Sequence, residues 1–254
     1  MKNIFLLITI LSSFFSFAQK NVNIVEYNYT TTQSEYFFNE FLVFNSNNFT
    51  YFGYGKGGEL TTYEQVRSSF DKRKISYYIE KDDNNLFYMG YKTPKIKRIT
   101  IDNFSPIKWQ ILNESKNILD YKCIKAVGEF RGRKYIAWFT KDISASYGPW
   151  KLGGLPGLIL EAEDDKGIFK FTARRIILNS NMELPPQLNE YISEKKKTIV
   201  PFKEYIELEN EYKRELRGQV LADFPIGSTI MKQSSLRESE IEIIFEWEKE
   251  PVKF

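Results

Sequence analysis

The sequence contains no histidine, and this absence excludes more chemistry than any residue that is present indicates. A Ser-His-Asp or Cys-His nucleophile system cannot be built in its usual form, and the common catalytic zinc sites rely on imidazole ligands. Carboxylate chemistry of the glycosidase kind stays open, although the acidic residues show no distinctive pairing. We therefore expect no catalytic residue, no metal site and no cofactor, and we favour a protein that is not an enzyme.

Cysteine is nearly absent as well. The single cysteine, Cys123, cannot form an internal disulfide, so an exported chain would depend on its hydrophobic core for stability. Cys123 stands in a strand-like stretch, residues 121–126, where a buried small hydrophobic side chain is its expected role. A reactive or pairing thiol is the alternative.

No charge of one sign dominates, because 36 Lys and Arg residues face 33 Asp and Glu residues. Nucleic-acid-binding domains usually carry a strong basic excess on one face, so we expect no nucleic-acid partner. The longest basic run, Lys195 to Lys197, follows Glu194 at the end of an expected helix. Cations at that position stabilise the helix dipole.

Long apolar runs are missing except at the N-terminus. Residues 1–18 combine Lys2, an apolar run and small residues before Gln19, which is the pattern of a secretory signal peptide. The run is shorter than the roughly 20 residues that a transmembrane helix needs, and Gln19 stands where a lipoprotein would need cysteine. We predict an exported, soluble protein of the periplasm or the exterior, with no membrane anchor, whose residues 19–254 form a single β-rich domain.

Most of residues 22–178 combine β-branched and aromatic runs with short polar turns, the pattern of antiparallel hairpins. Helices are expected within residues 60–74 and, with clearer amphipathic spacing, from Pro201 to Gly218. Residues 239–248 alternate almost strictly, which predicts a strand with one wet face. The other expected strands cover residues 22–30, 36–44, 48–52, 75–80, 86–91, 96–101, 107–112, 123–130, 134–140, 158–163 and 168–178.

These elements predict an α+β fold class that is mostly antiparallel β. We expect one large curved sheet or half-barrel with a few helices, similar by analogy to the periplasmic lipoprotein carriers. Such an analogy concerns the fold and is a weak basis for a function.

The most distinctive segment covers residues 147–160. Pro156 and Gly157 predict a type II turn, and the neighbouring Leu155, Leu158 and Ile159 are apolar where exposed turns are ordinarily polar. Two interpretations stay open. The turn seals one end of the sheet's core, or it offers an apolar loop to a ligand or partner.

Residues 154–159 spell the six letters after which the GLPGLI family of exported Gram-negative proteins is named, and the chain resembles that family over residues 117–171. The stretches around Cys123, Trp138 and Gly148 fall in the family's order and approximate spacing. The resemblance implies export and a strand-rich domain, but no agreed activity. The family-signature residues, with a structural role or a role in partner contact, are Gly148, Pro149, Gly154, Leu155, Pro156, Gly157, Leu158, Ile159, Cys123 and Trp138.

Three functions follow from these observations. The preferred one is a non-enzymatic binding protein for an apolar or amphipathic ligand or a peptide, because aromatic residues crowd residues 37–54. The first alternative is an accessory partner of an outer-membrane assembly, which would use residues 155–160 or the edge at 241–247. The second is a carboxylate-dependent glycan hydrolase that uses strand acids such as Glu161 and Glu163. The expected partners are therefore a lipid-like or peptide ligand, or an outer-membrane protein.

Overall fold

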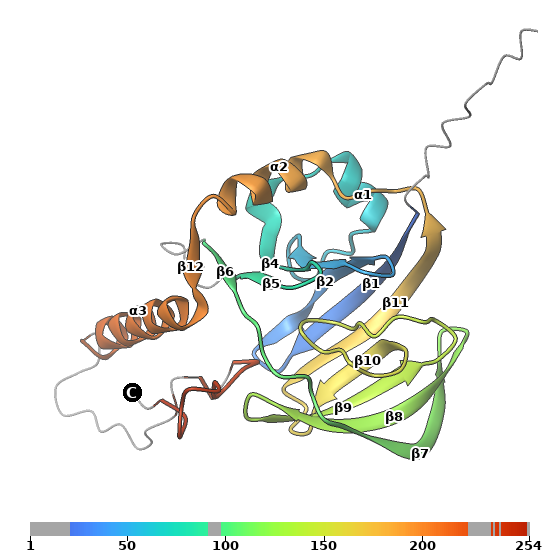
Figure 1. Ribbon diagram of the computed structural model, residues 1–254. Coiled ribbons are helices and arrows are strands. Elements are labelled where there is room, and N and C mark those ends of the chain that lie inside the picture. Colours follow the sequence, from blue (N-terminus) through green and yellow to red (C-terminus); the bar gives the residue numbers. More distant parts are fainter. Residues whose placement is uncertain (1–20, 91–97, 223–234, 236, 239, 253–254) are drawn as a thin grey trace, which may run out of the picture.

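Twelve strands form one open, curved sheet in the computed structural model (Figure 1), which describes residues 21–90, 98–222, 235, 237–238 and 240–252. The helices are α1 (Tyr63–Ser68), α2 (Pro186–Lys195) and α3 (Phe202–Ala222), and a short 3-10 turn covers Lys72–Lys74. The strands are β1 (Val22–Thr31), β2 (Ser34–Phe44), β3 (Phe49–Tyr54), β4 (Ile75–Lys81), β5 (Leu86–Met89), β6 (Ile99–Ile101), β7 (Trp109–Ile118), β8 (Tyr121–Phe130), β9 (Arg133–Thr140), β10 (Leu158–Asp164), β11 (Phe169–Ser180) and β12 (Ile199–Pro201).

Two antiparallel meanders build the sheet, and the pairing of β1 with β11 joins them. The strand order is β12-β6-β5-β4-β3-β2-β1-β11-β10-β9-β8-β7, and β12 with β6 is a parallel pair. Hairpins within each meander follow from local turn chemistry. Strands β1 and β11 are far apart in the sequence but pair in the sheet, with Tyr27 opposite Ala173. The predicted fold class, mostly antiparallel β with a few helices, is confirmed.

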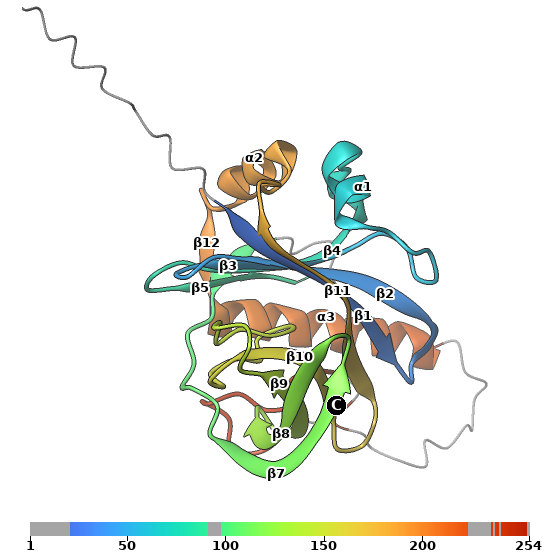
Figure 2. The ribbon, with the colours of Figure 1, turned by 90° about the vertical axis from the view of Figure 1, so that its right-hand side faces the viewer.

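Successive residues of a strand point to opposite faces of the sheet, and both faces are covered by apolar clusters. Helices α1 and α2 cover the outer face, where Ile24 and Phe52 share a cluster with Leu188 of α2. Figure 2 shows these helices on one side of β1–β5 and α3 on the other. On the inner face, Val25 and Tyr51 belong to a second cluster that includes the apolar residues of the 141–157 connection.

Helix α3 packs on the inner side of the sheet and begins one residue after the Pro201 start that its sequence predicts. Its first turns form a small cluster with β12 and the C-terminal segment, in which Phe202, Tyr205 and Ile206 pack against Phe245. Among the described residues, no helix is both long and apolar enough to cross a membrane. The expected signal peptide, residues 1–18, lies outside the described residues, as do residues 91 and 96–97 of two expected strands.

The strand expected at residues 239–248 is wrong. Over its described part, residues 240–248, the chain forms bends and a turn outside the sheet. Glu242, which the alternation places on the wet side, is buried, because it pairs with two cations on the inner side of the sheet. Alternation of apolar and polar residues therefore does not by itself predict a strand, because a strand also needs a neighbouring sheet edge to pair with.

The predicted type II turn is also wrong in kind. The Gly157 amide donates to the Leu155 carbonyl at 2.8 Å, so the turn closes over three residues instead of four. Gly157 has a φ of 154°, and a Cβ there would lie 2.0 Å from the Thr140 carbonyl oxygen. Only glycine fits this position, because the start of β10 passes directly against the end of β9.

Candidate functional site

A cavity of about 340 Å³ lies between the inner face of the sheet, α3 and the C-terminal strap, which we define as residues 240–252. Its volume falls at the lower end of the range of small-molecule sites, roughly 300–1,000 Å³. Strands β1–β5 and β11 provide one wall, Ile206 of α3 another, and Ile241 and Phe245 of the strap a third. Aromatic rings dominate this ring-lined cavity: Tyr29, Phe38, Tyr77, Tyr88, Trp150, Phe169 and Phe171.

A buried carboxyl group, that of Glu40, lies in the sheet wall of the cavity. Glu40 follows Phe38 by two residues on β2, so both side chains point to the inner face. The Tyr51 hydroxyl donates a hydrogen bond to Glu40 Oε2. Burial raises the pKa of Glu40 to about 8, although the hydrogen bond from Tyr51 opposes the rise. The carboxyl is therefore mostly neutral at pH 7, when it both donates and accepts hydrogen bonds.

Trp150 is held in the cavity wall by an unusual backbone conformation. Its φ is +56°, a region that residues other than glycine rarely adopt. Its ring meets Tyr77 and Tyr88 edge-on, with centroid distances of 4.8 and 5.6 Å. The side chain is 6% exposed, and its indole N–H donates to no acceptor among the described residues. A buried donor without a partner costs free energy, on the order of 1–3 kcal/mol.

The charged residues around the cavity are paired with one another. Lys213 of α3 lies 3.6 Å from Glu209 and 3.5 Å from Glu240 of the strap. Arg237, just before the strap, pairs with Glu248 and donates to Asn210 Oδ1 at 2.9 Å. These pairs join α3 to the strap and give each of these charged groups a partner of opposite sign.

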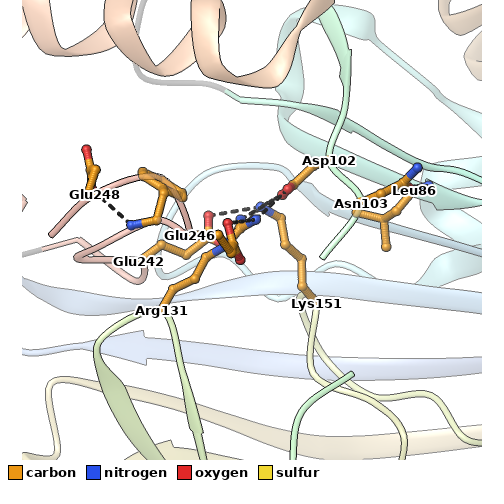
Figure 3. Close-up of polar contacts among 9 residues, drawn as sticks. Leu86, Asp102, Asn103, Arg131, Lys151, Glu242, Glu246 and Glu248 are labelled. Carbon is orange, nitrogen blue, oxygen red and sulfur yellow. Dashed lines mark hydrogen bonds and ion pairs between the residues drawn. The ribbon is translucent and has the colours of Figure 1, made fainter. Parts of the chain in front are cut away.

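A buried ion cluster fastens the strap to the sheet (Figure 3). Arg131 contacts Asp102 at 2.6 Å and Glu242 at 2.7 Å, and Lys151 contacts the same two carboxylates at 2.5 and 2.9 Å. Glu246, which is half exposed, completes the cluster at 3.0 Å from Arg131. Burial alone would raise the pKa of Asp102, but the Lys151 ammonium and the Arg131 guanidinium hold it below its usual value.

Local turn chemistry places Arg131 at this junction. Arg131 and Gly132 both have positive φ, 46° and 81°, which is the geometry of a two-residue hairpin turn between β8 and β9. The Arg131 carbonyl then accepts from the Ile243 amide at 2.9 Å, and the Tyr135 hydroxyl donates to the Ile241 carbonyl at 2.9 Å. The strap is thus held by backbone hydrogen bonds as well as by ion pairs.

The ten signature residues are all described, and none of them lines the ring-lined cavity. Leu155, Leu158 and Ile159 are buried in the inner cluster together with Cys123. Trp138 is half-buried, and the Lys116 ammonium lies 4.4 Å from its ring centroid. Gly154, Pro156 and Gly157 line a second, more polar groove of about 860 Å³, while Gly148 and Pro149 lie buried in the same loop.

The two strand acids singled out from the sequence carry ion pairs with lysines. Glu161 lies 2.7 Å from Lys116 and 3.4 Å from Lys170, and Glu163 lies 3.4 Å from Lys170. Both acids stand on β10, away from the ring-lined cavity. Burial raises the pKa of the Cys123 thiol to about 11, as expected for a structural cysteine.

The sequence interpretation missed Glu40 and named Trp150 only as part of the signature segment. One available signal was the inward register of Phe38, Glu40 and Leu42 on β2, which places an acid among residues that face the core. No local signal indicated that Trp150 would meet β4 and β5. That contact depends on the course of the 141–157 connection over the inner face.

A family model described as "N-glycanase peptide, N-terminal domain" matches residues 43–197, which is more than half of the chain. The assignment to the GLPGLI family was therefore wrong. Its six-letter segment is a short match, whereas the model spans β3 to α2. No curated protein matches the chain.

A solved structure of PNGF-II is similar to the chain in fold. Two crystal forms of PNGF-II match with 16% and 17% identity and TM-scores of 0.50 and 0.49, each over 71% of this chain. The chain spans 31% of the length of the PNGF-II chains it matches. A MucA/MucB complex of Pseudomonas aeruginosa matches at 11% identity and a TM-score of 0.36, over 67% of this chain and 56% of that one.

Proposed function

Because the chain belongs to the family of N-glycanase peptide N-terminal domains, we propose that it acts as a non-catalytic accessory domain in the processing of N-glycosylated proteins. The family match over residues 43–197 is the observation that carries this proposal. The domain would bind the glycosylated polypeptide, and the cleavage of the glycan would take place elsewhere.

The state of the acidic side chains favours an accessory role over hydrolysis by this domain. Hydrolysis by carboxylates needs one group that gives a proton and one that takes it. Glu209, Glu240 and Glu242 around the ring-lined cavity are held by cations, and Glu40 is buried beneath them. The first alternative drawn from the sequence was also an accessory role, but as the partner of an outer-membrane assembly. Action on glycoproteins also agrees with the export predicted from residues 1–18.

Binding to one glycoprotein in two forms tests the proposal. The immobilised chain is exposed to an N-glycosylated protein and to the same protein after its glycans have been removed. We expect binding at least tenfold tighter to the glycosylated form and no release of glycan by the chain alone. Equal binding to both forms would overturn the accessory role, and glycan release by the purified chain would show that the domain is itself catalytic.

A further inference from the structure

We propose that the ring-lined cavity binds one uncharged amphipathic small molecule, whose polar end accepts a hydrogen bond from Trp150 Nε1 and whose apolar body lies among the rings. This proposal does not depend on the proposed binding of glycoproteins. Three properties of the cavity support it: its volume, the pairing of its charged groups and the unpaired donor of Trp150.

The size and lining of the cavity determine the size and the apolar character of the ligand body. At about 340 Å³, the cavity has the volume of roughly ten water molecules at ~30 Å³ each. Its rings lie close together, with Tyr29 stacked on Phe171 at 4.9 Å between centroids. A bicyclic aromatic or a short aliphatic body fits this space, and contact with rings favours an apolar surface on the ligand.

The pairing of the charged groups in the lining favours an uncharged ligand. Lys213 and Arg237 are each paired with glutamates, and Glu242 is paired with the two cations of the buried ion cluster. An ion brought into the cavity would lose its hydration without gaining an opposite charge, which is costly in a buried site. A neutral ligand avoids this cost.

Trp150 fixes where the polar end lies. The positive φ of Trp150 is a conformation that needs support from its surroundings, and such outliers gather at binding sites. Its indole N–H is buried and lacks an acceptor among the described residues, so a ligand carbonyl or hydroxyl at this point would satisfy it. Glu40 then provides a second polar contact in the sheet wall, and it does so without a charge while it is protonated.

The protonation of Glu40 makes binding depend on pH. An ionised carboxylate holds water tightly, and a neutral ligand would have to displace that water. We therefore expect affinity to fall as pH rises through the pKa of Glu40, about 8. The titratable and charged groups that face Glu40 from the strands, α3 and the C-terminal segment are Tyr29, Tyr51, Tyr77, Glu209, Lys213, Arg237, Glu240 and Glu242.

Prodan, a neutral naphthalene dye with one carbonyl group, is a suitable probe because its emission reports polarity and hydrogen bonding. We expect the full chain to bind one molecule with a blue-shifted emission. Trp150→Phe keeps a ring but removes the donor, and it should weaken binding about fivefold to tenfold, the equivalent of one hydrogen bond. Trp109→Phe is the matched control, since its indole N–H donates to the Gly153 carbonyl at 2.8 Å outside the cavity.

Two further measurements keep the proposal testable if Trp150→Phe folds poorly. Wild-type affinity for prodan should fall several-fold between pH 6 and pH 9, and Glu40→Gln should remove that fall. Displacement by 1-octanol or by methyl β-glucoside identifies an aliphatic or a sugar-like natural ligand. Absence of prodan binding, equal loss in both tryptophan variants, the same pH profile in Glu40→Gln, or displacement by neither competitor would each overturn the site.

Discussion

Replacing Glu40 by glutamine should stabilise the folded chain at neutral and alkaline pH, by an amount that grows as pH rises. In the folded chain the pKa of Glu40 is about 8 against an ordinary value of 4.5, because burial disfavours the charged form. The folded state therefore keeps a proton that the unfolded state releases. Glu40 costs no stability below pH about 4.5. The loss of folding free energy grows as pH rises from about 4.5 to about 8, and it levels off above pH about 8.

The size of the effect follows from the two pKa values. One pKa unit corresponds to about 1.4 kcal/mol, so wild type should lose about 3–4 kcal/mol between pH 5 and pH 8 through this one group. The chain contains no histidine, so no imidazole titrates in this window. The glutamine side chain has nearly the same shape as that of Glu40, and its carbonyl still accepts the hydrogen bond from Tyr51.

Urea unfolding at several pH values between 5 and 9 measures this difference. The free energy of unfolding of Glu40→Gln minus that of wild type should rise from under about 1 kcal/mol at pH 5 to about 4 kcal/mol at pH 8. Glu190→Gln, on the exposed side of α2, is the control and should follow wild type. If the free energy of unfolding of Glu40→Gln depends on pH in the same way as that of wild type, the pKa of Glu40 is not raised and the reasoning is wrong.

Three further substitutions and one labelling measurement test the packing of the sheet and of α3. Lys151→Met leaves two buried carboxylates short of a cation and should lower the free energy of unfolding in urea by about 3–5 kcal/mol. Gly157→Ala forces a Cβ against the Thr140 carbonyl and should lower the free energy of unfolding by over about 2 kcal/mol. Gly218→Ala in α3 places a Cβ where nothing lies within 4 Å, and it should raise the free energy of unfolding by up to about 1 kcal/mol. Burial raises the pKa of Cys123 to about 11, so a thiol reagent at pH 8 should label it roughly a hundredfold more slowly in the folded than in the unfolded chain.

Hairpin strands and the amphipathic α3 could be predicted because their signals are local. Turn residues such as Arg131 and Gly132 set the φ values that join β8 to β9, and inward apolar positions set the register of each hairpin. The same rules failed at residues 240–248. The alternation there is real, but Glu242 is turned inward because Arg131 and Lys151 lie on the inner side of the sheet and pair with it.

The six-letter match at residues 154–159 illustrates a second limit. These residues are mostly buried and shape one turn of the core, so their pattern reflects local packing. The candidate site lies elsewhere. It unites Glu40 of β2, Trp150 of a long connection, Lys213 of α3 and Phe245 of the strap, which are far apart in the sequence.

By itself, the sequence determined which chemistry is excluded and most of the hairpin strands, since residue types and near-neighbour spacing decide both. The absence of histidine and the single Cys123 are examples. The tertiary structure alone decided that β1 pairs with β11, that the strap crosses the inner face, and that a cavity remains beneath it. The physical reason is that burial and ion pairing depend on which distant surfaces meet, and a carboxyl such as that of Glu40 changes its pKa only after they have met.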